Sequence, residues 1–201
     1  MCALPMPVTS NIDRQKLLHR LFLEPTEWLF ISGLAGASKD TAALTDDGIN
    51  LFSMAGTMGA AVPMGLGMAL SAPDKNIAVI TGDGEMLMGI GALATVASMQ
   101  PKNLKIVCVD NSMHGETGRQ TGFTARTANL ELIARGAGIE RTMTISEVSH
   151  ITEAAIFLSE PAAGPAFLVC RTTPTEPSAY KRNMNPGECR TRFRQGYLAV
   201  S

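Results

Sequence analysis

The sequence is poor in the features by which proteins recognise nucleic acids or enter membranes. Aromatic residues make up only 5% of the chain, so stacked platforms for single-stranded nucleic acid are not expected. The formal net charge is -1, which gives no electrostatic attraction to nucleic acid or to an anionic membrane surface. No apolar run is long enough to span a bilayer. We therefore expect neither a nucleic acid nor a membrane among the partners.

Cysteines are few and scattered. The four of them (Cys2, Cys108, Cys170 and Cys189) form no CxxC pair and no spacing typical of a metal site. Cys108 and Cys170 lie in apolar runs, where a free thiol behaves as a small hydrophobic side chain. This usage favours a reducing compartment. Because residues 1–15 lack a basic start followed by a long apolar stretch, we expect no signal peptide and a cytoplasmic location.

What the chain does contain is typical of a globular domain. Hydrophobic residues make up 45% and charged residues 17% of its 201 residues, which suits one domain with a real core. We find no internal repeat and no interdomain linker, so we expect a single domain over 1–201 with its core at about 12–172. The basic, proline-rich extension 173–201 is expected to cross the surface or to reach a partner.

Apolar segments alternate with helical patterns along the chain. Strands are expected at 27–33, 49–56, 76–82, 104–110 and 165–172. Helices are expected at 11–25, 37–45, 62–73, 85–100, 129–138 and 146–160. Strands that are apolar throughout indicate a sheet that is covered on both faces. The predicted fold is therefore a three-layer α/β/α domain with a mostly parallel sheet.

Polar residues follow two of these strands, as GDG at 82–84 and DN at 110–111. Ligands of parallel sheets bind beyond the carboxyl ends of the strands. A carboxylate from Asp83 and an amide oxygen from Asn111 would suit Mg²⁺ there, and the glycines would let the backbone approach a ligand. The helix expected from Glu85 would point its N-terminus at the same place. These features indicate a metal–diphosphate site, although an isolated GDG is more often only a sharp turn.

Four stretches of the sequence resemble the thiamine-diphosphate-dependent decarboxylases and synthases. The first, GDGEMLMGIGALATVASMQPKNLKIVCVDN at 82–111, is similar to their GDG…NN signature, and SMAGTMGAAVPMGLGMALSAPDKNIAVITGDG at 53–84 is also typical of them. FISGLAGASKDTAAL at 30–44 and DNSMHGETGRQTGF at 110–123 resemble in particular the small (beta) subunit of sulfopyruvate decarboxylase and phosphonopyruvate decarboxylase. The resemblance covers about 12–172 and implies the thiamine-diphosphate-binding fold, with thiamine diphosphate and Mg²⁺ as cofactors.

The resemblance implies a role for several residues at the two strand ends. Asp83, the Asn111 side chain and the backbone carbonyl of Met113 would bind Mg²⁺. The amides of Gly84 and Glu85 would hold diphosphate oxygens. Many relatives have Ser or Ala at the position of Glu85, so its carboxylate is expected to point away from the phosphate or towards the metal.

The resemblance also implies residues for the organic part of the cofactor. Gly56 would offer its carbonyl to the aminopyrimidine, and Met58 would be the apolar wedge that bends the cofactor and brings the amine towards the thiazolium. Thr57 and Gly82 complete the expected cofactor-binding set.

The loop after Asn111 contains the candidate catalytic residues, His114 and Glu116. Both would face the substrate, with His114 as an acid or a hydrogen-bond donor, unless they only fix the loop. Relatives often have an aromatic residue at the position of His114. Arg119 would meet a sulfonate, phosphonate or carboxylate, unless it is a surface charge.

Thiamine enzymes need a second module that contributes a glutamate to the pyrimidine ring, and no segment of this sequence resembles it. We therefore expect the diphosphate-binding subunit of a split 2-oxo acid decarboxylase, of the sulfopyruvate or phosphonopyruvate type, which releases CO₂ and an aldehyde. It would form a hetero-oligomer with a separate pyrimidine-binding (alpha) subunit and be inactive alone. The alternatives are a subunit of a carboligase of the acetolactate synthase type, and a non-catalytic nucleotide- or flavin-binding or regulatory subunit.

Overall fold

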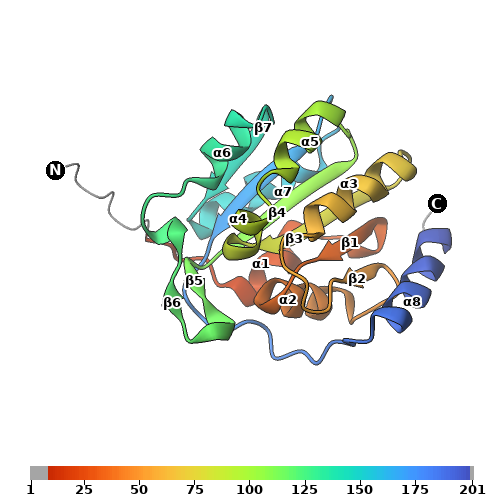
Figure 1. Cartoon of the computed structure of the whole chain (residues 1–201), viewed down its shortest axis with the longest axis horizontal. Coiled ribbons are helices and arrows are strands. Elements are labelled where there is room, and N and C mark those ends of the chain that lie inside the picture. Colours follow the sequence, from red (N-terminus) through yellow and green to blue (C-terminus); the bar gives the residue numbers. More distant parts are fainter. Residues whose placement is uncertain (1–8, 200–201) are drawn as a thin grey trace.

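The computed structural model describes residues 9–199, so Cys2 and most of the stretch examined for a signal peptide lie outside the described residues. Six strands form one sheet with the order β2-β1-β3-β4-β8-β7, and every pairing in it is parallel (Figure 1). The strands are β1 (Trp28–Ser32), β2 (Leu51–Ser53), β3 (Asn76–Gly82), β4 (Leu104–Asp110), β7 (Arg141–Ile145) and β8 (Ala166–Arg171). The predicted parallel α/β sheet is therefore confirmed.

Helices cover both faces of the sheet. They are α1 (Arg14–Leu21), α2 (Ala35–Thr45), α3 (Ala61–Ser71), α4 (Asp83–Met88), α5 (Ala92–Met99), α6 (Leu130–Gly136), α7 (Ile151–Ser159) and α8 (Pro186–Ala199). Side chains of α1, α2 and α7 share one buried apolar cluster, and those of α3 to α6 share the other. Because successive strand residues point to opposite faces, Ile77 and Val79 enter one cluster while Ala78 and Ile80 enter the other. This double burial explains the unbroken apolar runs in the sequence.

The structure differs from the predicted helices and strands at one helix and at one edge strand of the sheet. The helix predicted at 85–100 is two helices, α4 and α5, separated at Gly89. A Cβ atom at Gly89 would lie 2.3 Å from the backbone oxygen of Gly59, so the chain breaks where the loop after β2 packs against it. Strand β7 was not predicted. It lies at the edge of the sheet and is half-exposed over most of its length, so it lacks the apolar run on which the prediction depended.

The C-terminal segment returns across the molecule from the end of β8 and finishes in α8, beside the edge strand β2 (Figure 1). This helix was not predicted. The Phe193 ring packs edge-on against Phe52, with 5.7 Å between the ring centroids. Gly196 lets α8 come close, because a Cβ atom there would lie 2.1 Å from the Ile49 carbonyl oxygen. The helix thereby covers an edge that would otherwise invite pairing with another chain.

The register of β3 and β4 sets the position of the polar residues singled out above. Gly82 pairs with Val109, so the residues that follow, Asp83 and Asp110, leave the sheet at the same edge. Strands β3 and β4 are direct neighbours in the sheet. In residues 9–199, no helix is both long and apolar enough to cross a membrane.

Candidate active site

Two buried aspartates meet at the carboxyl ends of β3 and β4. Asp83 is 3% exposed and Asp110 is 1% exposed. The Thr124 hydroxyl lies 3.1 Å from Asp83 Oδ2 and 2.8 Å from Asp110 Oδ1. A hydroxyl has one hydrogen to donate, so it can satisfy only one of the two carboxylates at a time.

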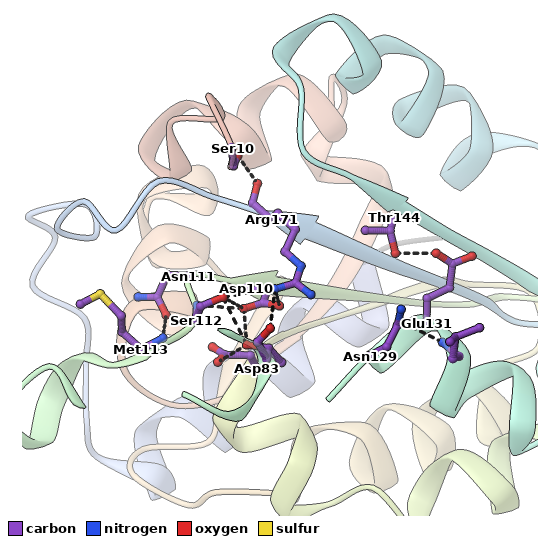
Figure 2. A network of polar contacts seen from close by, with 12 residues as sticks. Ser10, Asp83, Asp110, Asn111, Ser112, Met113, Asn129, Glu131, Thr144 and Arg171 are labelled. Atoms are coloured by element: carbon purple, nitrogen blue, oxygen red, sulfur yellow. Dashed lines mark hydrogen bonds and ion pairs between the residues drawn. The ribbon is translucent and has the colours of Figure 1, made fainter. Parts of the chain in front are cut away.

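The electrostatics of this pair favour a cation. Burial, and after it repulsion from Asp110, together raise the pKa of Asp83 to about 7. Arg171 stands opposite Asp110 in the register of β8, and its Nη1 lies 3.1 Å from Asp110 Oδ2 (Figure 2). Within the described residues, that Oδ2 accepts no hydrogen bond. One arginine against two buried acids leaves a negative charge that a divalent cation would neutralise, and this fits Mg²⁺.

The chain turns back immediately after Asp110. Asn111 Oδ1 accepts a hydrogen bond from the Met113 amide at 3.1 Å, which closes a tight turn around Ser112. The Gly122 amide donates to the Ser112 carbonyl at 2.7 Å, so the far end of the loop folds onto this turn. Asp83, Asn111 and Met113 all line the same cavity. No cluster of three or more His, Cys, Asp or Glu side chains occurs in residues 9–199, so a metal here would need amide, carbonyl and ligand oxygens as well, which Mg²⁺ accepts.

The glycine at 84 makes room for a histidine ring. A Cβ atom there would lie 3.1 Å from both Cε1 and Nδ1 of His114, so the imidazole lies against the first turn of α4. The ring also meets Phe123 edge-on, with centroids 6.3 Å apart. His114, which the loop after Asn111 carries, is therefore beside the GDG turn.

Glu85 turns its carboxylate towards the connection between β1 and α2. Its Oε2 accepts a hydrogen bond from the Leu34 amide at 3.0 Å, whereas its Oε1 is buried without a partner in the described part of the chain. A Cβ atom at Gly33 would lie 1.6 Å from Oε2, so this contact requires glycine. Burial is the main cause that raises the pKa of Glu85. The carboxylate thus ties the start of α2 to the start of α4.

A cavity of about 220 Å³ lies between these elements. Of the residues predicted for the site, its lining includes Met58, Gly82, Asp83, Gly84, Glu85, Asn111, Met113, His114 and Glu116. Gly56 and Thr57 are not part of the lining and belong to the loop before α3. The structure therefore brings together residues from both strand ends and from the loop after Asn111.

Cationic side chains on the cavity wall are each paired with an acid. Lys39 Nζ lies 3.4 Å from Glu116 Oε1. Arg119, expected to be a cation for the substrate, forms an ion pair with Glu176 of the C-terminal segment and donates to the Pro174 carbonyl at 3.0 Å. The cavity is therefore partly walled by a segment that the sequence analysis had placed outside the core.

Several site residues were missed by the sequence analysis. Arg171 ends β8, so the rule that identified Asp83 and Asn111 at strand ends would also have found it. Thr124 lies in an irregular loop and carries no pattern that indicates contact with the aspartates. Arg14 lines the cavity from α1, far away in sequence, and only the packing of α1 against α2 reveals it.

Comparison with known proteins agrees with this geometry. The family of the thiamine pyrophosphate enzyme, C-terminal TPP binding domain, matches residues 39–170. Sulfopyruvate decarboxylase subunit beta of Methanococcus maripaludis is 30% identical over 183 residues, which are 91% of this chain and 96% of the relative. The subunit of the same name from Methanocaldococcus jannaschii is 43% identical over 118 residues, which are 59% of this chain and 62% of that relative.

Longer proteins are similar over part of their length. Phosphonopyruvate decarboxylase of Streptomyces hygroscopicus is 32% identical over 94% of this chain, which spans only 47% of that protein. Among solved structures, the 4-hydroxybenzoylformate decarboxylase of Rhodococcus jostii RHA1 has a TM-score of 0.67 at 19% identity, over 84% of this chain and 34% of that one. Fold, strand-end site and matched family agree, and the chain belongs to the C-terminal TPP-binding domain family of thiamine pyrophosphate enzymes.

Proposed function

We propose that the chain is the diphosphate- and Mg²⁺-binding subunit of a thiamine-diphosphate-dependent 2-oxo acid decarboxylase of the sulfopyruvate or phosphonopyruvate type. The observation that carries the proposal is the buried pair of Asp83 and Asp110, of which Asp83 lines the cavity. Relatives named for these two decarboxylations support the substrate class, which is a small 2-oxo acid with a second acid group.

Each part of the site has a role in holding the cofactor. Asp83, the Asn111 side chain and the Met113 carbonyl would bind Mg²⁺, while Arg171 and Thr124 hold Asp110 in place. The amides of Gly84 and Glu85, at the start of α4, would donate to the diphosphate. The remaining cofactor contacts are assigned to Gly56, Thr57, Met58 and Gly82.

The chemistry divides between the cofactor and the protein. When bound, thiamine diphosphate supplies the electron sink that stabilises the negative charge left when a 2-oxo acid loses CO₂. His114 would hold a proton at a ring nitrogen and donate it to the substrate, because its ring lies against Gly84 on the cavity wall. Lys39, held at the rim by its ion pair with Glu116, would orient the acid groups of the substrate, and Glu116 would face the substrate beside it.

A partner subunit is supported by the surface beside the cavity. The backbone at Gly59 packs against the backbone at Met88 and Gly89, and the neighbouring Met58 and Met88 side chains are 37% and 67% exposed. Exposed apolar side chains gathered at a site are typical of a surface that binds another protein. We assign this surface to a pyrimidine-binding (alpha) subunit, which agrees with relatives named as beta subunits. The cysteines that the structure describes, Cys108, Cys170 and Cys189, are free and buried, as suits a cytoplasmic enzyme.

The first test is cofactor binding by calorimetry. Wild-type chain should bind thiamine diphosphate only when Mg²⁺ is present. Asp83→Ala and Asn111→Ala should each abolish this Mg²⁺-dependent binding. Asp47→Ala is the matched control, because Asp47 pairs with Arg192 outside the cavity. Binding that needs no Mg²⁺, or that survives Asp83→Ala unchanged, would contradict the cofactor site.

The second test is turnover with the candidate partner subunit. The pair should release CO₂ and an aldehyde from sulfopyruvate or phosphonopyruvate, faster than from pyruvate, and this chain alone should be inactive. A condensed product from two carbonyl compounds would instead identify a carboligase. If no 2-oxo acid yields CO₂, the decarboxylase proposal fails, and turnover by the isolated chain would refute the split.

A further inference from the structure

One cation on the cavity wall differs from the others in its burial. Lys39 and Arg119 have side chains that are 35% and 53% exposed, and their ion pairs lie at the rim. Arg14, the first residue of α1, lines the same cavity but is only 5% exposed. A buried guanidinium with an outlet to a cavity is unusual, because arginine is costly to remove from water unless something binds it.

Arg14 is held on one side by a single acid. Its Nε and Nη2 lie 2.8 Å and 2.7 Å from Oδ2 of Asp40, which is itself 2% exposed. The other oxygen of Asp40 accepts a hydrogen bond from the Ser178 amide at 2.7 Å. Asp40 is thus fixed by the C-terminal segment and in turn fixes the plane of the guanidinium.

The guanidinium lies directly against the first turn of α2. A Cβ atom at Gly36 would lie 2.2 Å from Arg14 Nη2 and 2.8 Å from Nη1, so glycine is required for this approach. Across residues 9–199, Nη1 has no hydrogen-bond partner. A fixed fork with an unpaired nitrogen, beside the N-terminus of an 11-residue helix, has the geometry with which arginine binds oxyanions.

Stability alone does not account for the arrangement. A buried ion pair is often replaceable by apolar side chains with no loss of stability, so its presence is weak evidence for a stabilising role. Here the pair also requires a glycine in α2 and a backbone contact from the C-terminal segment. These requirements follow if the guanidinium must stand at a fixed place on the cavity wall.

We infer that Arg14 binds a tetrahedral oxyanion in the cavity, with Asp40 and Gly36 as its positioning residues. The inference rests on the proposed function, which supplies two sources of such a group. One is the terminal phosphoryl group of thiamine diphosphate, and the other is the sulfonate or phosphonate group of the substrate. A planar fork is suited to either group because both present several equivalent oxygens.

The experiment compares two variants with a matched control on the full chain. Arg14→Gln combined with Asp40→Asn removes the fork without leaving a buried acid unpaired, and Gly36→Ala keeps every charge but displaces the guanidinium. The control combines Arg192→Gln with Asp47→Asn, which removes another arginine–aspartate pair. With Mg²⁺ present, calorimetry gives the Kd of thiamine diphosphate and of thiamine monophosphate. The cofactor-loaded chain is then titrated with phosphonoacetate, and circular dichroism checks that each variant is folded.

Loss of a charge-assisted hydrogen bond should weaken one ligand by about 10–100-fold in the double variant, and in the same direction in Gly36→Ala. Weaker binding of thiamine diphosphate, with thiamine monophosphate less affected, identifies the cofactor as the source. Weaker binding of phosphonoacetate alone identifies the substrate. Folded variants that bind both ligands within about threefold of wild type would overturn the inference while the proposed function stands. Wild-type chain that binds neither ligand would refute both.

Discussion

Without a metal, the ionised form of Asp83 should lower the free energy of unfolding of this protein by a measurable amount. Burial and the neighbouring Asp110 raise the pKa of Asp83 from 3.8 to about 7, so the ionised form is disfavoured in the folded chain. The cost is absent below pH 3.8, grows as the pH rises towards 7, and is complete above it. In metal-free buffer, the free energy of unfolding of wild type should therefore fall across this range. Asp83→Asn, which keeps the shape and removes the charge, should not show this fall.

The size of the effect follows from the same numbers. A pKa that moves from 3.8 to about 7 corresponds, at about 1.4 kcal/mol per unit, to a ceiling of about 4 kcal/mol. Relaxation of the structure around the acid lowers that ceiling, so we expect Asp83→Asn to be more stable than wild type by about 2–4 kcal/mol at pH 8. The Thr124 hydroxyl can still donate to the amide oxygen of the variant, so its contact is retained.

Urea unfolding in EDTA, followed by circular dichroism at pH 5 and pH 8, measures the difference. The difference in the free energy of unfolding between Asp83→Asn and wild type should be larger at pH 8 than at pH 5. Glu85 also has a raised pKa, but it is present in both proteins and cancels in the comparison. Adding Mg²⁺ with thiamine diphosphate should reverse the order, because only wild type binds the metal. An Asp83→Asn chain that is less stable than wild type at pH 8 in EDTA would refute the reasoning.

Two further predictions concern residues outside the site. Burial and Arg141 lower the pKa of Lys105 to about 8, so the charge of this lysine destabilises the fold below pH 8, and the destabilisation disappears towards pH 10.5. Lys105→Met should therefore raise the free energy of unfolding, measured by urea titration, by about 1–3 kcal/mol at pH 7, and should give no gain near pH 10.5. Gly196→Ala should push α8 from β2 and cost about 1–3 kcal/mol, with aggregation visible by light scattering, whereas Gly187→Ala in the same helix should do neither.

Much of the fold can be predicted because its strands are buried on both faces. A segment such as 76–82 is apolar at successive positions, which an amphipathic helix would not show, and the parallel sheet follows from it. Sequence pattern does not reveal an element that is buried on one side only, or a break that a distant part of the backbone causes. Strand β7 lacks the apolar run, and the break at Gly89 depends on contact with Gly59.

The site divides in the same way. Residues that follow buried strands could be found from local pattern, and the family resemblance extended them to the loop around His114. Arg14 and Glu176 could not, because nothing near them in the sequence indicates the α1–α2 contact or the path of the C-terminal segment. The residues at the carboxyl edge of the sheet can be predicted from local sequence, whereas the residues that wall the cavity depend on packing between distant segments.

The exchange at position 110 can be understood from charge. The family resemblance implies an asparagine pair after β4, and this chain has Asp110 in the first place, which adds one negative charge to a buried site. Arg171 lies opposite Asp110 in register and 3.1 Å from its carboxylate, so its positive charge compensates the negative charge of Asp110. The sum leaves the charge of Asp83 facing the cavity, as in a site with two asparagines. Asp110 and Arg171 therefore form one unit, and the metal is left to Asp83, Asn111 and the chain that turns back at Met113.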